Sequence, residues 1–307
     1  ISPKFIIKMN TTEAVFSIKD MENISGIKAH TIRIWEKRYN LLSPKRTDTN
    51  IRHYDLENLK KLLNISFLNN NGLKISKIAA LKASELAPKT RELAFMGKSE
   101  SQAINAFKLS MLNFDQTLFY NTYNRLLEEK SFREIFYEVF IPLLCDLGML
   151  WQTNVITPSH EHFLTMHIKQ KILVHIERLQ GLNPKPSNKT VVLFLPNDET
   201  HDLGLQFINY EILSHGFHSI FLGESIPLND LRYVNELYED ITYISYFTVE
   251  PSTNDVGEYL KKFAETYLEN SNNRAKFMGR RTANIDPKNI PNKVRLYENV
   301  EDLVKDL

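Results

Sequence analysis

The sequence predicts a multidomain fold of the α plus α/β class, in which two helical parts precede a parallel sheet covered by helices. The 307 residues exceed the length of a typical single domain. Through the first 180 residues, apolar side chains recur every three or four positions, which is the period of an amphipathic helix. After residue 188, short apolar runs alternate with helix-length stretches, a pattern typical of parallel sheets.

Composition excludes several other classes of protein. A hydrophobic fraction of 42% suffices for a buried core, and ten glycines with twelve prolines do not make a fibrous or linker-like chain. No apolar run reaches the roughly 18 residues of a membrane span, and no secretory signal pattern is visible. Cys145 is the single cysteine, so it has no partner for an internal disulfide. We expect a cytoplasmic protein that does not enter the membrane.

Charge is divided unevenly along the chain. Residues 1–84 hold fifteen Lys and Arg against seven Asp and Glu, a net charge of +8, whereas the whole chain has a net charge of +1. The remaining residues therefore sum to −7. A basic N-terminal part joined to an acidic body favours nucleic-acid binding at the basic end, and a solvated charged surface is the alternative.

Two candidate linkers divide the chain. The stretch Glu85–Thr90 interrupts a helical pattern with a proline, and Gly181–Lys189 combines glycine, two prolines, serine and asparagines. These linkers predict three domains, over residues 1–85, 90–181 and 188–307.

The basic N-terminal part predicts a helix-turn-helix followed by a hairpin. Apolar positions within Ile18–Ile24 and Ile32–Trp35 indicate two short helices, with a turn at Gly26. The second helix is crowded with cations and hydroxyl groups, a surface that could enter a major groove. The polar stretch 45–55 then predicts a wing that could touch phosphates, and a new helix begins near Asp55.

Residues 16–81 resemble the winged-helix DNA-binding domain of MerR-type transcription regulators. The resemblance rests on the run HTIRIWEKRYNLLSP, the R-x-Y of the wing and the later GLKISKIAAL. Asn50 replaces the usual wing glycine, but asparagine tolerates the left-handed conformation. Trp35 is equally compatible with core packing and with a position facing DNA. The resemblance implies dimeric binding to palindromic operator DNA, with contacts from Thr31, Arg33, Arg38, Tyr39, Arg46, Arg52 and Tyr54.

The middle segment predicts an antiparallel bundle of four or five helices. Helical patterns cover about 101–112 and 115–128, and Thr157 with Pro158 predicts the start of a last helix that ends near Gln180. One apolar stripe between these helices is formed by Phe132, Phe136, Val139, Leu143, Leu147 and Leu150. In the third segment, apolar runs predict strands at 191–195, 219–223, 241–247 and 275–279.

A histidine in the loop after the first of these strands is a candidate ligand. Glu199, His201 and Gly204 form the pattern E-x-H-x-x-G, followed by an amphipathic helix. This order places His201 at the carboxyl edge of a parallel sheet, where such sheets bind ligands. Taken alone, the pattern also fits a loop histidine satisfied by nearby backbone groups.

Together with the following strands, this segment resembles the Rossmann-like cobalamin-binding domain. The resemblance implies that His201 is the lower ligand of cobalt and that Glu199, in place of the usual aspartate, supports the other ring nitrogen. It also implies that Ser245 lines the cavity for the nucleotide tail and that Gly204 and Gly279 adjoin the cofactor. No Gly-x-Gly-x-x-Gly follows the first strand, which argues against a dinucleotide site.

The bundle carries a further pattern, W-x9-E-H, formed by Trp151, Glu161 and His162. By themselves these residues fit a core aromatic and a solvated first turn. With the cobalamin pattern, the chain resembles the light-sensing, adenosylcobalamin-dependent MerR-type repressors of the CarH and LitR type. This resemblance implies that the three residues surround the adenosyl group. It further implies that the cofactor assembles monomers or dimers into a tetramer in the dark, and that light reverses the assembly.

Two other functions stay open. A MerR-type regulator controlled by another ligand or partner is favoured by Arg280, because the family usually has a second glycine there. A cobalamin carrier subunit of a methyltransferase would explain the third segment but not the basic N-terminal part. The sequence shows no Ser-His-Asp triad and no zinc-binding Cys-His set, so we expect no enzymatic activity.

Overall fold

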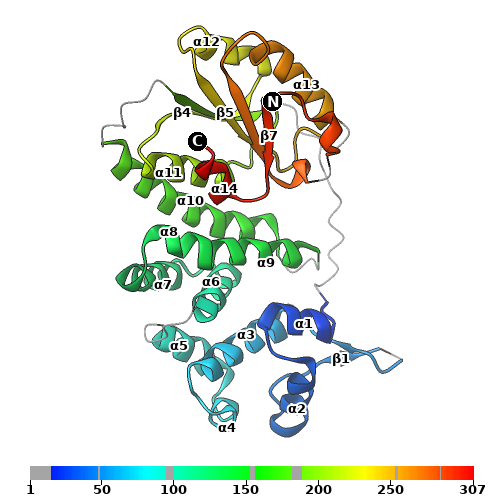
Figure 1. Cartoon of the computed structure of the whole chain (residues 1–307). Coiled ribbons are helices and arrows are strands. Elements are labelled where there is room, and N and C mark those ends of the chain that lie inside the picture. Colours follow the sequence, from blue (N-terminus) through cyan, green and yellow to red (C-terminus); the bar gives the residue numbers. More distant parts are fainter. Residues whose placement is uncertain are drawn as a thin grey trace. The chain divides into compact units, whose positions relative to one another are not determined.

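The computed structural model describes residues 15–47, 49–94, 100–152, 156–181, 189–252, 255–283 and 285–307 (Figure 1). The chain forms two compact units, unit 1 over residues 1–168 and unit 2 over residues 169–307. Among the helices in these described ranges, none is long and apolar enough to cross a membrane.

Unit 1 begins with the predicted helix-turn-helix, formed by α1 (Ile18–Ser25) and α2 (Ala29–Tyr39). The Ser17 hydroxyl accepts a hydrogen bond from the Asp20 backbone N–H at 3.2 Å, and the Asp20 carboxylate accepts one from the Ser17 N–H at 2.8 Å. This reciprocal cap fixes the start of α1. The helix ends at Gly26, whose φ of 73° lies in the left-handed region that favours glycine.

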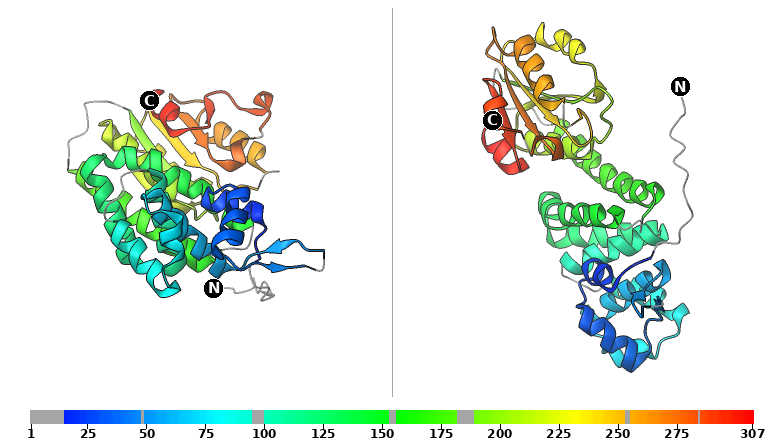
Figure 2. Two further views of the ribbon diagram at one scale, coloured as in Figure 1. Left: turned by 90° about the horizontal axis from the view of Figure 1, so that it is seen from below. Right: turned by 90° about the vertical axis from the view of Figure 1, so that its right-hand side faces the viewer.

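A two-stranded hairpin follows α2 and forms the predicted wing. β1 (Lys45–Arg46) and β2 (Arg52–His53) pair antiparallel, and the hairpin projects from the surrounding helices of unit 1 (Figure 2). Asn50 has a φ of 64°, so this residue adopts the left-handed conformation expected at the position of the usual glycine.

Three further helices complete the N-terminal part: α3 (Leu56–Asn70), α4 (Ile75–Ala79) and α5 (Ala83–Ala94). The predicted linker at Glu85–Thr90 is wrong, because α5 runs through it with Pro88 inside the helix. Leu86 and Thr90 are 5% and 1% exposed, and α5 packs against α3. This burial outweighs the cost of about 3 kcal/mol for a proline within a helix. Residues 182–188 of the second predicted linker lie outside the described residues, and the three-domain division stays a prediction.

The bundle contains the predicted helices. Phe132, Phe136 and Val139 of the predicted stripe are buried, as are Leu143 and Leu147, whereas the Leu150 side chain lies outside the described part. A π-helical turn over Phe136–Phe140, absent from the prediction, interrupts this segment. The bundle elements are α6 (Glu100–Asn113), α7 (Gln116–Glu129), α8 (Phe132–Ile135), the turn η1 (Phe136–Phe140), α9 (Ile141–Gln152) and α10 (Pro158–Gln180).

Unit 2 is a parallel five-stranded sheet in the order β4-β3-β5-β6-β7. The four predicted strands are confirmed, and β7 is an additional short strand. The strands are β3 (Thr190–Pro196), β4 (His218–Ile226), β5 (Ile241–Tyr246), β6 (Arg274–Met278) and β7 (Val294–Tyr297). The helices are α11 (Leu203–Ser214), α12 (Arg232–Asn235), α13 (Val256–Tyr267) and α14 (Val300–Lys305).

Helices cover both faces of the sheet, as predicted (Figure 1). On one face, Phe194, Tyr243 and Phe277 pack with Phe263 and Tyr267 of α13 in one buried cluster. On the other face lie α11 and α14, which contact each other. Helix α11 connects β3 to β4 and α13 connects β5 to β6, so the two connections run in opposite directions across the sheet. Because both crossovers are right-handed, α11 and α13 must lie on opposite faces. The same topology places the loops that follow β3 and β5 side by side at the carboxyl edge.

Candidate cofactor and DNA sites

The loop between β3 and α11 holds the predicted histidine at the carboxyl edge of the sheet. The His201 side chain is 56% exposed, whereas the Glu199 side chain is fully buried. Nδ1 of His201 lies 2.6 Å from Oε1 of Glu199. Nε2 has no hydrogen-bond partner among the residues that the structure describes. The ring is therefore held on one side and open to a ligand on the other.

The carboxylate of Glu199 is surrounded by backbone donors. Oε1 accepts hydrogen bonds from the N–H groups of Thr200 and His201, both at 3.0 Å. Oε2 accepts three more, from Thr248 at 3.1 Å, Val249 at 2.6 Å and Glu250 at 2.9 Å. Burial by itself raises the pKa of this carboxyl group above its ordinary 4.5. The backbone N–H donors and the His201 ring together outweigh that effect, and the resulting pKa is about 2. The group is thus ionised at neutral pH.

This arrangement determines what the histidine can do chemically. An ionised carboxylate only accepts hydrogen bonds, so the ring proton resides on Nδ1 and the lone pair of Nε2 faces outward. A neutral imidazole nitrogen supported in this way is a good ligand for a transition metal such as cobalt. The extra methylene of Glu199, relative to aspartate, lets the carboxylate reach both His201 and the loop 248–250.

Two glycines of the predicted site lie where an added Cβ atom would have close neighbours. A Cβ atom at Gly204, in the first turn of α11, would lie 3.0 Å from the Tyr246 ring. At Gly279, where φ is 115°, a Cβ atom would lie 2.5 Å from the carbonyl oxygen of Phe247. Gly279 is therefore required for packing in this structure, whereas a side chain at Gly204 would need the Tyr246 ring to shift by a few tenths of an ångström.

Ser245 is fully buried, and its Oγ has no hydrogen-bond partner among the described residues. An unpaired buried hydroxyl costs about 1–3 kcal/mol, so this atom is suited to a polar group of a ligand. Together with the outward-facing Nε2 of His201, this orphaned hydroxyl means that the residues present fit a cobalamin.

Arg280 follows Gly279 in the place of the expected second glycine, and its side chain is exposed. Its neighbour Arg281 donates from Nε to the carbonyl oxygen of Val249 at 2.8 Å. The loop 248–250 is therefore held by both Glu199 and Arg281. Sequence reasoning missed this loop, because backbone N–H donors leave no signal in the residue types. It also missed Asp202, whose Oδ2 pairs with Nζ of Lys169 at 2.6 Å.

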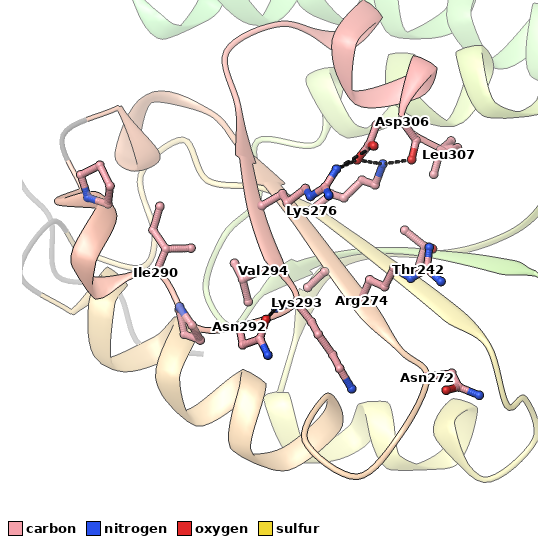
Figure 3. Close-up of a pocket in the computed structure, with 14 residues that line it drawn as sticks. Thr242, Asn272, Arg274, Lys276, Ile290, Asn292, Lys293, Val294, Asp306 and Leu307 are labelled. Atoms are coloured by element: carbon pink, nitrogen blue, oxygen red, sulfur yellow. Dashed lines mark hydrogen bonds and ion pairs between the residues drawn. The ribbon is translucent and has the colours of Figure 1, made fainter.

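A recess of about 820 Å³ lies at the opposite edge of the sheet, near the starts of β5, β6 and β7 (Figure 3). Three of the cations that line it, Lys276, Lys293 and Arg295, are paired within the fold. Lys276 lies 2.9 Å and Arg295 2.7 Å from the Asp306 carboxylate, and Lys293 donates to the Ser271 carbonyl oxygen at 2.6 Å. This recess is separate from the loop that carries His201.

In the bundle, Glu161 and His162 lie in the first turn of α10. The Glu161 side chain is 27% exposed and the His162 side chain 72%, and Oε2 and Nε2 are 3.6 Å apart. The structure thus brings these two residues together on an accessible surface. Trp151 lies in the last turn of α9, but its side chain falls outside the described residues.

Most of the predicted DNA contacts lie on accessible parts of α2 and the wing. Arg33, Arg38 and Arg46 are exposed, and Thr31 and Tyr39 are half-buried. The guanidinium carbon of Arg38 lies 5.5 Å from the centroid of the Tyr39 ring. Nη1 of Arg46 donates to Asn50 at 2.6 Å, which braces the wing.

Two of the predicted contacts are engaged inside the domain. Tyr54 is 1% exposed, and its hydroxyl donates to Glu36. Burial raises the pKa of the Tyr54 phenol, and Glu36 raises it further. The predicted contact at Tyr54 is therefore corrected, because its ring belongs to the core. Arg52 pairs with Glu36 at 2.9 Å and is 27% exposed at its side chain. Trp35 is 7% exposed and packs in the core as well.

Comparison with known proteins finds two family models that match different parts of the chain. The family model for MerR HTH family regulatory proteins matches residues 16–85, and that for a B12 binding domain matches residues 103–174, which cover α6 to α10. The transcriptional repressor CarH of Myxococcus xanthus is 27% identical over 76% of this chain and 79% of its own length. CarA, a second transcriptional repressor from this bacterium, is 21% identical over 70% of each chain.

A solved structure shows the same fold. The monomethylamine corrinoid protein of Methanosarcina barkeri superposes with a TM-score of 0.55 at 13% identity, over 68% of this chain and 98% of its own. The MerR-type helices, the B12-type bundle and the sheet with His201 in a loop at its carboxyl edge thus occur in one chain, with two regulators among its relatives. The chain therefore combines a MerR HTH domain with a B12-binding domain, and along most of its length it is similar to two transcriptional repressors.

Proposed function

We propose that this chain is a transcription repressor whose operator binding is controlled by adenosylcobalamin and light through cofactor-dependent assembly. The observation that supports it most is the contact of 2.6 Å between Nδ1 of His201 and the buried Glu199 carboxylate. This contact leaves Nε2 free to bind cobalt. Repression is supported by the two relatives from Myxococcus xanthus, both of which are named repressors.

The proposal gives each group of residues one task. His201 would ligate the cobalt from below, with Glu199 fixing its tautomer, and Ser245 would donate its hydroxyl proton to the nucleotide tail. The family resemblance assigns the upper adenosyl group to Trp151, Glu161 and His162. When bound, adenosylcobalamin supplies a cobalt–carbon bond that light can break.

Control of DNA binding then follows from unequal affinities. A cofactor stabilises an assembly only to the extent that it binds the assembly more tightly than the free chain. We propose a tetramer with the cofactor in the dark and a monomer or dimer without it. An assembly engages several operator contacts at once, which raises its effective affinity over that of a single DNA-binding domain.

The test is gel filtration of the full chain with and without adenosylcobalamin, in the dark and after green light, with the absorption spectrum recorded across each peak. We expect cobalamin to co-elute with a larger dark species that becomes smaller on illumination. A dark species of unchanged size that carries cobalamin would refute control by assembly. Elution without cobalamin would refute the cofactor itself.

The alternative is a regulator that responds to another ligand or partner, and Arg280 is the residue that favours it. In the structure, however, the Arg280 side chain is exposed. We therefore propose that cobalamin binding tolerates this arginine. The same gel filtration separates the two candidates, because only the first predicts co-elution.

A further inference from the structure

Ile34 is an exposed apolar residue in the middle of the basic face of α2. Its exposed fraction is 52%. His30 lies four positions before it and Lys37 three positions after it, so the three share one face of the helix, and both are exposed. Arg33, the preceding residue, is exposed as well.

Packing on the other side of α2 fixes this orientation. Ile32 and Trp35 are 0% and 7% exposed and anchor the helix in the domain core. Ile34 therefore cannot turn inward. Arg33 and Lys37 have no ion-pair partner among the described residues, so the face around Ile34 combines free cations with one apolar side chain.

Such exposure is unusual within this domain. Among the described residues from 16 to 85, Ile34 and Ile51 are the large apolar side chains with more than half of their surface exposed, at 52% and 57%. Ile34 belongs to α2, whereas Ile51 belongs to the wing beside β2. An isoleucine exposed to this extent adds little to folding, and its apolar surface gains free energy only when a ligand covers it.

We propose that Ile34 contacts the C5 methyl group of a thymine in the major groove of the operator and so selects an A·T pair at that position. The inference rests on the proposed DNA binding and adds a residue that reads sequence. The thymine methyl is the apolar group that base pairs present in the major groove. A side chain without donors or acceptors cannot read the other groups by hydrogen bonds.

The charges around Ile34 decide which kind of partner fits. Arg33 and Lys37 flank it and attract phosphates, which position a recognition helix without reading sequence. Ile34 then lies between these phosphate contacts and nearer the groove floor. A protein partner would instead need an acidic surface with an apolar centre, and it is treated below as an outcome of the test.

The experiment uses the full chain with adenosylcobalamin in the dark and a duplex that this chain selects from a randomised pool. Each thymine of the selected site is replaced in turn by deoxyuridine, which lacks only the methyl group. We expect one replacement to weaken wild-type binding about four-fold, the equivalent of one buried methyl group. Ile34→Ala should bind the two duplexes equally. Ile51→Ala is the matched control and should keep the wild-type response to that replacement.

Three outcomes would overturn the inference. If Ile34→Ala and the wild type lose the same affinity at every replaced thymine, Ile34 does not contact a methyl group. If Ile34→Ala binds DNA normally but elutes as a smaller species, the residue is a protein contact. If the wild type selects no duplex, the proposed DNA binding itself fails, and this is seen before any variant is compared.

Discussion

The buried carboxylate of Glu199 accepts hydrogen bonds from five backbone N–H groups and from the ring of His201. Glu199→Gln keeps the shape but replaces an acceptor oxygen by an NH₂ group that faces donors. We expect a loss of about 2–4 kcal/mol in the free energy of unfolding of unit 2, because charged hydrogen bonds are lost and donors stay unpaired. This loss is measured by urea unfolding of the full chain, with a spectroscopic signal that reports on unit 2.

The same residue gives a pH dependence with a definite sign. The pKa of Glu199 is about 2 in the folded chain against an ordinary 4.5, so its ionised form stabilises the fold above pH 4.5. This contribution falls as the pH drops from 4.5 toward 2. The difference between wild type and Glu199→Gln should therefore be constant near neutral pH and shrink in acid. A difference that grows in acid would contradict the assigned ionisation.

At this scale, the resemblance to the cobalamin-binding domain predicted that Glu199 supports the His201 ring, and the two residues lie in one short loop after a strand. The three donors at 248–250 come from a different loop and are backbone atoms, so no residue type marks them. Tyr54 is a residue for which the predicted role was wrong. The family resemblance predicted a DNA contact at Tyr54, but no residue pattern indicated that its hydroxyl binds Glu36 inside the domain.

At the scale of elements, α6 joins the bundle to the first DNA-binding helix through a buried lysine. The Lys108 side chain is 5% exposed, and its Nζ lies 2.6 Å from Oδ2 of Asp146 on α9. It also donates to the carbonyl oxygen of Ile24 near the end of α1, at 3.1 Å. One ammonium group thus connects three helices of unit 1.

Lys108→Met should destabilise unit 1 by about 1–3 kcal/mol, because the carbonyl oxygen of Ile24 and the carboxylate of Asp146 both lose a buried charged donor. Hydrogen exchange of the α1 amides should become faster, since the end of this helix is no longer held. Lys130→Met is the control. Lys130 also pairs with two carboxylates, Glu100 and Glu138, but these are half exposed, so its loss should cost clearly less than the loss of Lys108. Equal losses in the two variants would contradict the role of Lys108.

Periodicity predicted the long elements well and the short or strained ones poorly. Helices α6, α7 and α10 repeat their apolar stripe over three or more turns, which leaves little ambiguity. β7 has four residues, too few to show a pattern. Pro88 indicated a linker, but packing of Leu86 onto α3 keeps α5 continuous. The π turn at Phe136–Phe140 is not visible in spacing, because its rings pack with Phe107 and Phe119 only after folding.

At the scale of the whole molecule, the fold class was predicted from the order of three different segments along the chain. A basic N-terminal part, a bundle and a sheet follow one another, and each was indicated by a different signal: charge, helical period and alternation. Assembly differs from the fold of a single chain, because it depends on protein concentration and on a cofactor as well as on the residues of one chain. The proposal about assembly therefore comes from the family resemblance and not from the periodicity or charge of the chain.

The decisive variants separate the lower ligand from the upper contacts. His201→Ala removes the imidazole proposed to bind cobalt, so we expect cobalamin-dependent assembly to be lost. The folding of the chain and the basic surface of α2 should stay unchanged. Trp151→Ala should still co-elute with cobalamin but should assemble equally with the adenosyl and hydroxo forms, because only the proposed adenosyl contact is removed. Gel filtration in the dark with each cobalamin, read at cobalamin absorption, measures both. A His201→Ala chain that assembles as the wild type does would show that the histidine is held by Glu199 for packing alone.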